Sequence, residues 1–295
     1  MASDIADLIN RYDTRAGAIK DFSAEDVREI FRDRNLNLER DTLLIVKDEV
    51  PIAYAMLWPM GPDAHVVAFG VVDPKHWGRG LGSHLVDFLC ARAEEIQRER
   101  GKELTVRLHI ETGDEPANEL ARSRGFEVVR GNFTMHVEFD DEPIRDEAPE
   151  WLTIRTCTLD DSKLCHDLVE ETFAEHFGHT PRSFEEWEQG LSAREDFDPT
   201  LWWIAYDGDE PTGLLLGYKM GDMGWVADLG VRKCYRKRGI AATLLRHAFA
   251  EFQRRGMTSA GLGVDSQNET GAVALYESVG MHVAKSYRTY ERKFS

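Results

Sequence analysis

The sequence predicts an α/β (α+β) fold organised as two tandem domains, each with one central sheet flanked by helices. Two observations carry this prediction. Short β-type runs alternate with long amphipathic segments in each half, an order typical of a sheet covered by helices. A glycine-rich stretch also recurs at the same point of this strand–loop–helix pattern, so that Gly80 and Gly239 lie 159 residues apart.

Two further landmarks repeat in the same order. Gly125 and Gly280 lie 155 residues apart, as do Phe139 and Phe294 at the end of each half. Landmarks at a nearly constant offset indicate a duplication, and the period is too long for a solenoid. A stretch between the halves is acidic, holds two prolines and lacks periodicity, which is typical of a linker. We therefore expect an N-terminal domain over residues 1–142, a linker over 143–150 and a C-terminal domain over 151–295.

Residue spacing places the individual elements. In the first half we expect strands at 43–47, 52–58, 66–72, 104–110 and 133–139, with helices at 80–100 and 116–124. In the second half we expect a helix from Asp160 or Asp161 towards Phe177, strands at 151–155, 202–206, 214–220, 225–231, 260–264 and 287–293, and helices at 239–255 and 270–278. Asp207–Glu210 reads as a hairpin turn, and each half is expected to end in its own closing strand.

Composition narrows the class of protein. The chain has 295 residues and a net charge of −17, which opposes nucleic-acid binding and suits a cationic partner. It has no apolar run of about 18 residues and no secretory signal, so we expect no membrane association. Its four cysteines are scattered without C-x-x-C spacing. These features favour a cytoplasmic protein without a zinc site. The sequence does not indicate the oligomeric state.

The repeated loop has the chemistry of a phosphate-binding site. Backbone N–H groups that open a helix attract anions, because they point outward and the helix dipole adds positive charge. A P-loop is excluded because no G-K-[ST] follows, and a Rossmann loop is disfavoured because this loop comes after a hairpin. The expected phosphate-binding residues are Arg236, Lys237, Arg238, Gly239, Ile240 and Ala241 in the second loop, and Val72, Gly78, Arg79, Gly80 and Gly82 in the first.

The segment Arg236–Ala241 fits the pattern Q/R-x-x-G-x-G/A, and Asn268 followed by Ala272–Met281 forms a second signature. With these motifs the second half resembles the GNAT superfamily of acyl-CoA-dependent N-acetyltransferases almost throughout. The resemblance implies a mixed, mostly antiparallel sheet in each half and acetyl-CoA as co-substrate. It further implies that Asn268 helps to bind the cofactor, and that the backbone of Leu229, Gly230 and Val231 holds the pantetheine or polarises the thioester.

The resemblance also implies direct attack by an amine on the thioester. Tyr276 stands where the family often has the acid that protonates the leaving thiolate, and a packed helix residue is the alternative. Asp228 is the candidate base, because a carboxylate in an apolar strand is costly unless it is paired or catalytic. A structural hydrogen-bond acceptor at a bulge is its alternative.

Acidic residues on the first helix of the second half are expected to line the acceptor site. Glu171, Glu175 and Trp225 are the candidates there, although the resemblance implies a glutamate early on the loop strand where this chain has Trp225. Glu170, His176 and His179 lie nearby, but the two histidines have no further ligands at metal spacing, so no metal is expected. A solvated helix face is the alternative for each of these residues singly.

The two halves differ in their chemistry. In the first half Trp77 replaces the usual Gln or Arg, Ala121 stands at the position of Tyr276, and the strand 66–71 has no acid. We therefore expect the second half to acetylate the amine of a small molecule, while the first half binds acetyl-CoA weakly or serves as a scaffold. Acetylation of peptide or protein amines, and non-catalytic acyl-CoA binding, remain alternatives.

Overall fold

The computed structural model describes residues 1–13, 22–59, 65–176, 179, 181–192, 197–267 and 271–295. The chain forms two compact units. Unit 1 consists of Met1–Asn132 together with Ser286–Ser295, and unit 2 consists of Phe133–Lys285. Among the described residues, no helix combines the length and apolar character that crossing a membrane requires.

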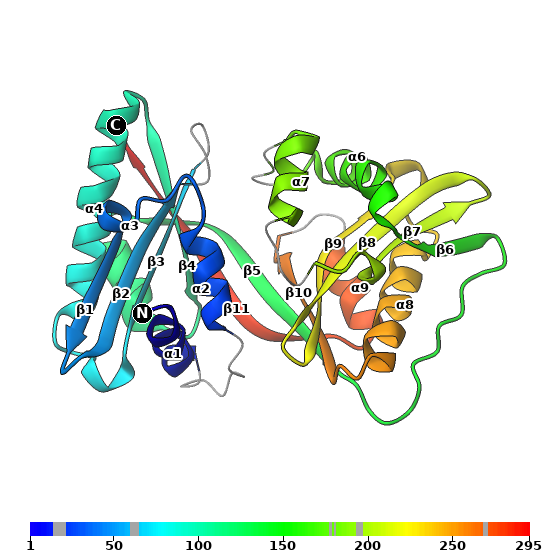
Figure 1. The fold of residues 1–295 in the computed structure, drawn as a ribbon, viewed down its shortest axis with the longest axis horizontal. Coiled ribbons are helices and arrows are strands. Elements are labelled where there is room, and N and C mark those ends of the chain that lie inside the picture. The colour runs from blue at the N-terminus through cyan, green and yellow to red at the C-terminus, as the bar shows by residue number, and fades with distance from the viewer. Residues whose placement is uncertain (14–21, 60–64, 177–178, 180, 193–196, 268–270) are drawn as a thin grey trace. The chain divides into compact units, whose positions relative to one another are not determined.

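Unit 1 is a sheet with helices on both faces (Figure 1). Its strands are β1 (Thr42–Lys47), β2 (Val50–Pro59), β3 (Val66–Val72), β4 (Leu104–Glu111) and the C-terminal part of β11 (His282–Phe294), in the order β1-β2-β3-β4-β11. Only β3 and β4 of these pair in parallel. The helices are α1 (Ala2–Asp13), α2 (Ala24–Phe31), α3 (Leu38–Asp41), α4 (Leu81–Arg100) and α5 (Glu115–Ser123). One core lies under α1 and α2, and a second lies under α4 and α5.

Unit 2 repeats this plan. Its strands are β6 (Leu152–Thr156), β7 (Trp202–Asp207), β8 (Glu210–Met220), β9 (Met223–Val231), β10 (Ser259–Asp265) and the C-terminal part of β5 (Glu127–Glu138), in the order β5-β10-β9-β8-β7-β6. Its helices are α6 (Ser162–Phe173), α7 (Phe184–Ser192), α8 (Ile240–Arg254) and α9 (Ala272–Ser278). Helices α6 and α7 cover one face, and α8 and α9 cover the other. The predicted fold class is confirmed.

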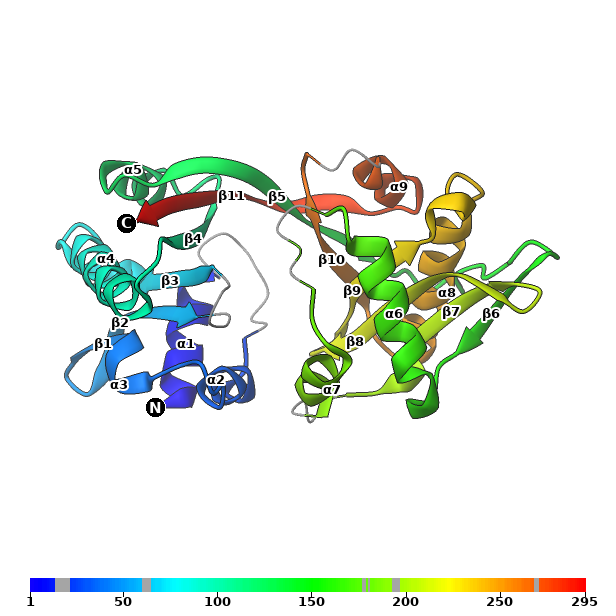
Figure 2. The same cartoon turned by 90° about the horizontal axis from the view of Figure 1, so that it is seen from above.

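The closing strands are exchanged, which corrects the expectation that each half ends in its own strand. β5 starts in unit 1 and enters unit 2 (Figure 2). There the buried Met135 joins the core beneath α8. β11 makes the reverse passage, and Tyr290 and Phe294 are buried in the core of unit 1. Tyr290 pairs with Leu108 of β4 in that sheet. The spacing of apolar residues predicts a strand but not the sheet that it joins, because the sheets of both halves offer the same kind of edge.

Most element bounds agree with the predicted ranges within a few residues. The hairpin at Asp207–Glu210 forms as expected, with Gly208 at φ 62°. Helices α1, α2, α3 and α7 were not among the expected elements. For α2 the sequence does carry a signal, because Ser23 and Asp26 form a capping box, in which the Asp26 amide donates to Ser23 Oγ at 3.2 Å.

Candidate active site

The two glycine loops have the same backbone conformation. In unit 2, Gly239 has φ 84° and directly precedes α8, and Lys237 has φ 64°. In unit 1, Gly80 and Gly78 take the equivalent places with φ 80° and 71°. Neither helix has a side-chain cap at this end, so its first amides are left for solvent or a ligand. Both loops are therefore built to receive an anion.

Glycine is required in the second loop for its backbone angle and not for lack of space. A Cβ built on Gly239 would meet no atom within 4 Å, so the loop backbone is open to an approaching phosphate. Lys237 adopts a left-handed conformation without the freedom of glycine, and this costs about 1 kcal/mol. The side chains of Lys237 and Arg238 are exposed beside this opening.

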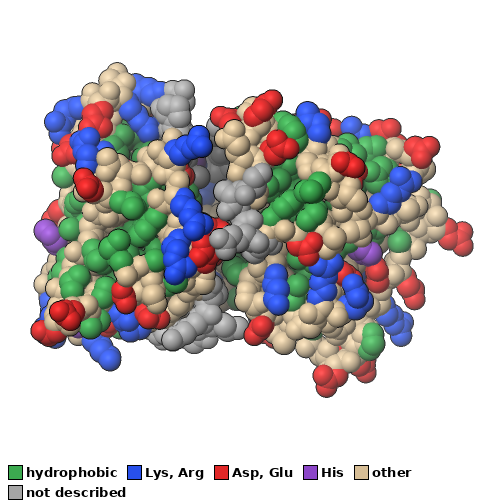
Figure 3. Space-filling view, viewed as in Figure 1, with side chains coloured by type: hydrophobic (Ala, Val, Ile, Leu, Met, Phe, Trp, Pro, Cys, Tyr) green, Lys and Arg blue, Asp and Glu red, His purple; other side chains and the backbone are tan. Residues whose placement is uncertain are grey.

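The cations around the second loop are partly engaged by carboxylates. Arg232 Nε lies 3.0 Å from Glu171 Oε2, and Lys233 Nζ lies 3.1 Å from Glu175 Oε1. Glu171 and Glu175, expected at the acceptor site, thus form ion pairs with the base of the glycine loop. On the face drawn in Figure 3, acidic side chains are scattered over each unit and do not gather in one patch.

Strands β9 and β10 separate just before the loop. They pair from Met223 and Ser259 up to Val226 and Leu262, and among the described residues the ladder stops there although both strands continue. The Arg232 amide donates to Thr212 O of β8 at 2.9 Å. Because hydrogen-bonded and non-bonded positions alternate in antiparallel pairs, the backbone groups of Leu229 and Val231 face away from β8, into this opening. The structure thus brings these amides next to the glycine loop.

A β-bulge rotates Asp228 to the α6 face of the sheet. The pairing of β9 with β8 shifts between Leu216/Asp228 and Gly217/Val226, so Ala227 is the extra residue. Val226 packs in the core under α8, whereas a Cβ on Gly230 would come within 2.2 Å of Thr172 Oγ1 on α6. Asp228 lies two residues before Gly230 and therefore faces α6 as well. Trp225 lies on this face too, with its ring against Gly261.

Asp228 shares this face with a group of polar side chains. Burial raises its pKa, and the Glu170 carboxylate raises it further, whereas Arg182 and His179 act in the opposite direction. Glu170 Oε2 lies 2.9 Å from His179 Nε2, and both side chains are mostly buried. The other oxygen, Glu170 Oε1, is buried and has no hydrogen-bond partner within the described part of the chain. These groups leave an acceptor oxygen available to a cationic ligand.

His176 borders the same region. Burial lowers its pKa, and the nearby Arg236 and His179 lower it further, while Asp265 and Glu175 oppose them. The neutral imidazole is therefore favoured. Because Arg236 belongs to the glycine loop, its effect on the pKa of His176 shows that His176 lies near that loop.

Tyr276 lies on α9 in the core that this helix shares with α8, and its side chain is 9% exposed. Burial raises its pKa to about 12, so the phenol keeps its proton at neutral pH. Asn268 lies outside the described residues. Sequence reasoning considered Glu170 and His179 but selected Glu171 and Glu175, because helical spacing alone does not show which flank of α6 borders β9.

Unit 1 has a different arrangement at the corresponding places. Phe69 stands where unit 2 has Asp228, and β3 pairs with β2 without a bulge. Ala121 is buried at the place of Tyr276. Tyr12 of α1 donates its hydroxyl hydrogen to Asp114, the N-cap of α5, and its ring packs against Trp77 of the first glycine loop.

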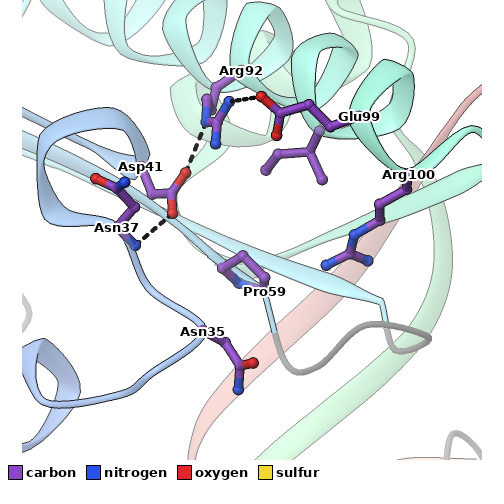
Figure 4. A pocket seen from close by; sticks show the side chains of 8 residues that line it. Asn35, Asn37, Asp41, Pro59, Arg92, Glu99 and Arg100 are labelled. Atoms are coloured by element: carbon purple, nitrogen blue, oxygen red, sulfur yellow. Dashed lines mark hydrogen bonds and ion pairs between the residues drawn. The ribbon is translucent and has the colours of Figure 1, made fainter.

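A separate hollow of about 360 Å³ opens in unit 1 between α3 and α4 (Figure 4). Its charged wall is internally neutralised, because Arg92 Nε donates to Asp41 Oδ1 at 2.7 Å and both side chains are buried. The backbone amide of Asn37 also donates to Asp41 Oδ2, at 2.8 Å. This hollow shares no residue with the glycine loops, and we assign it a structural role.

The opening between two strands, the amides that face into it and the uncapped helix behind a glycine turn agree with the acyltransferase class that the motifs predicted. Residues 3–126 and 162–281 match the Acetyltransferase (GNAT) family. The chain therefore belongs to this family in tandem form and is an acetyl-transferring enzyme, as the motifs predicted.

Known proteins resemble the whole chain. It is 28% identical over 270 residues to mycothiol acetyltransferase of Clavibacter sepedonicus, covering 85% of this chain and 81% of that protein. A GCN5-related N-acetyltransferase from Sphaerobacter thermophilus is 32% identical, with a TM-score of 0.83 over 99% of this chain and 92% of that one. A tandem GNAT protein from the clavulanic acid biosynthesis pathway has a TM-score of 0.70 at 13% identity, covering 99% and 94% of the two chains, and shares the fold.

Proposed function

We propose that unit 2 transfers an acetyl group from acetyl-CoA to the primary amine of a small molecule. The observation that carries this proposal is the position of Asp228, Glu170 and His179 beside the opening between β9 and β10. An acidic, partly buried group favours an ammonium ion over a neutral or anionic acceptor. The similarity to mycothiol acetyltransferase supports a small-molecule acceptor.

Binding of the donor follows from the loop. The amides at the start of α8 and the side chains of Arg236, Lys237 and Arg238 would hold the phosphates of coenzyme A. The thioester would extend into the opening of β9, where the Leu229 and Val231 amides can donate to its carbonyl oxygen. That oxygen gains negative charge during attack, so donors already oriented towards it favour the transition state.

Proton transfer follows from the two ionisable groups. Asp228 takes a proton from the ammonium, and the free amine then attacks the carbonyl carbon to give a tetrahedral intermediate. The C–S bond breaks and Tyr276 protonates the leaving thiolate. The nitrogen loses its second proton to solvent as the amide forms, and Tyr276 regains a proton from solvent. Burial raises the pKa of Asp228, which makes it a stronger proton acceptor. Burial also raises the pKa of Tyr276, which makes it a weaker acid, but a buried thiolate is likewise a stronger proton acceptor, and this offsets the loss.

Unit 1 is proposed to bind acetyl-CoA weakly or to act as a scaffold. Its loop keeps the backbone of a phosphate site, but Phe69 and Ala121 stand in place of the two proton-transfer groups. Calorimetry of acetyl-CoA binding to the intact protein, with Gly80 and Gly239 replaced separately, would distinguish one binding site from two.

An amine-panel assay that follows release of free thiol from acetyl-CoA tests the proposal. Turnover with small primary amines is the expected result, and failure with the entire panel would favour a non-catalytic binder. Peptides that begin with alanine belong in the panel. Over 69 residues, or 23% of its length, the chain is 33% identical to the [ribosomal protein bS18]-alanine N-acetyltransferase of Escherichia coli. Turnover with these peptides alone would favour a protein substrate.

A further inference from the structure

Two histidines and a glutamate converge on one surface of unit 2. His136 and Glu138 come from β5, and His282 begins β11. One potential ligand atom from each residue lies within 4.8 Å of the other two. His136 and Glu138 are two positions apart in a strand and therefore point to the same side of it. The two imidazole rings meet edge to face, with centroids 6.0 Å apart.

One of the three separations already matches that between ligands of a single small cation. Zinc binds histidine nitrogen and carboxylate oxygen at about 2.0–2.2 Å, so neighbouring ligands of a tetrahedral ion lie roughly 3.4 Å apart. His136 Nδ1 and Glu138 Oε1 already lie 3.3 Å apart. The Glu138 side chain is 69% exposed, so it can rotate to shorten its separation from His282.

The ligands differ in how firmly they are held. The His136 side chain is only 15% exposed and sits on a regular strand, so its ring direction is set by packing. Because His282 comes from a strand distant in sequence, local strand geometry alone does not explain the convergence. Two histidines and one carboxylate form a common zinc donor set, with a fourth position left for water.

We propose that His136, Glu138 and His282 bind a divalent transition-metal ion, with zinc as the best match. This departs from the sequence-based expectation of no metal, because the three ligands become neighbours only through the passage of β5 into unit 2. The site is independent of the proposed acetyl transfer.

The ion would clamp β5 to the turn between α9 and β11. The Met281 amide, next to His282, donates to Tyr276 O at the end of α9, at 3.0 Å. On the other side of the turn, a Cβ at Gly280 would lie 3.8 Å from Val137 of β5. Metal binding would therefore stabilise the folded form of unit 2, because the unfolded chain does not bring these ligands together.

The test is calorimetry of the intact, chelator-treated protein with zinc chloride, supported by the visible absorption of added cobalt(II). We expect one zinc ion per chain, at least about tenfold weaker binding in His282→Ala, and weakened binding in Glu138→Gln. A tetrahedral cobalt spectrum should disappear in His282→Ala.

The exposed His84 on α4 provides a matched control, because His84→Ala removes a surface imidazole elsewhere. Circular dichroism would verify that every variant is folded. Equal zinc affinity in the wild type and in His282→Ala, or no binding by the wild type at 100 times the protein concentration, would overturn the proposal. A zinc-dependent rise in the melting temperature that His282→Ala abolishes and His84→Ala retains would support it.

Discussion

Arg236 and Trp77 make the same hydrogen bond in the two units. Arg236 Nε donates to the carbonyl oxygen of Val231 at 3.1 Å, and Trp77 Nε1 donates to that of Val72 at 2.8 Å. Each bond ties its glycine loop to the end of the preceding strand. The loop shape is therefore retained in both units, but only unit 2 adds a cation there, so the two loops differ in charge more than in geometry.

Replacing Gly239 by valine should reduce acetyl transfer by about 100-fold or more. A β-branched residue at φ 84° is strained, and its side chain would stand in the space that a phosphate needs. Steady-state kinetics with acetyl-CoA would measure the change. Gly80→Val is the matched control, because it places the same strain at φ 80° in unit 1. If both variants lose the same activity, unit 1 takes part in the reaction.

Tyr276→Phe should lower kcat by about 100-fold while the KM for acetyl-CoA changes little. The substitution removes a proton donor and keeps the packing of the ring in the α8–α9 core. Tyr206→Phe, on β7, removes a phenol away from the opening and should leave kcat unchanged. An unaltered kcat in Tyr276→Phe would leave Tyr276 with a packing role only.

Asp228→Asn should remove the acid limb of the pH–rate profile together with most of the activity. Because burial raises the pKa of Asp228, the wild-type limb should lie above the ordinary range of an aspartate, with activity falling as pH drops. Asp209→Asn, in an exposed turn, is the control. A profile that keeps its acid limb in Asp228→Asn would point to a different base.

The same substitution should stabilise the fold at neutral pH. A carboxyl group with a raised pKa in the folded state costs no stability below its unfolded pKa. Above that pKa it costs stability, because the unfolded chain then releases the proton more readily. Asparagine removes this cost, so the melting temperature of Asp228→Asn should exceed that of the wild type at pH 7.5 but not at pH 3. The reverse order would mean that Asp228 makes stabilising interactions as an anion.

Glu170→Gln should raise the KM for the amine more than the KM for acetyl-CoA. The neutral amide keeps the size of the side chain but weakens the attraction for an ammonium ion and for His179. Glu188→Gln on α7 is a control of the same chemistry on the neighbouring helix. Equal changes in both KM values would argue for a structural role of Glu170 at the end of α6.

A fragment of residues 1–142 should not fold cooperatively, although the sequence reads as a complete first half. It lacks the buried Tyr290 and Phe294, which contribute roughly 1.5–3 kcal/mol each, and it exposes the edge of β4. Circular dichroism during thermal unfolding would measure this. Coexpression with residues 143–295 should restore a stable complex. A cooperative transition for 1–142 alone would show that unit 1 can fold without the exchanged strand β11.

Local patterns were sufficient for much of the fold and for the loop. The strand before Gly239, the helix after it and the hairpin at Asp207–Glu210 follow from residue spacing and turn chemistry within a few neighbouring residues. The face of β9 that carries Asp228 could not be predicted in this way. A single extra residue at Ala227 reverses the alternation, and a bulge has no distinct composition here.

The sequence by itself determined the duplication, the glycine loops and the acetyltransferase family, because glycine angles and helix starts are local properties of the backbone. The tertiary structure decided which carboxylates border the opening of β9 and which sheet each closing strand joins. It also made His136 and His282 neighbours. Those relationships join segments distant along the chain. They depend on which sheet edge and which helix flank meet, and a one-dimensional pattern leaves that choice open.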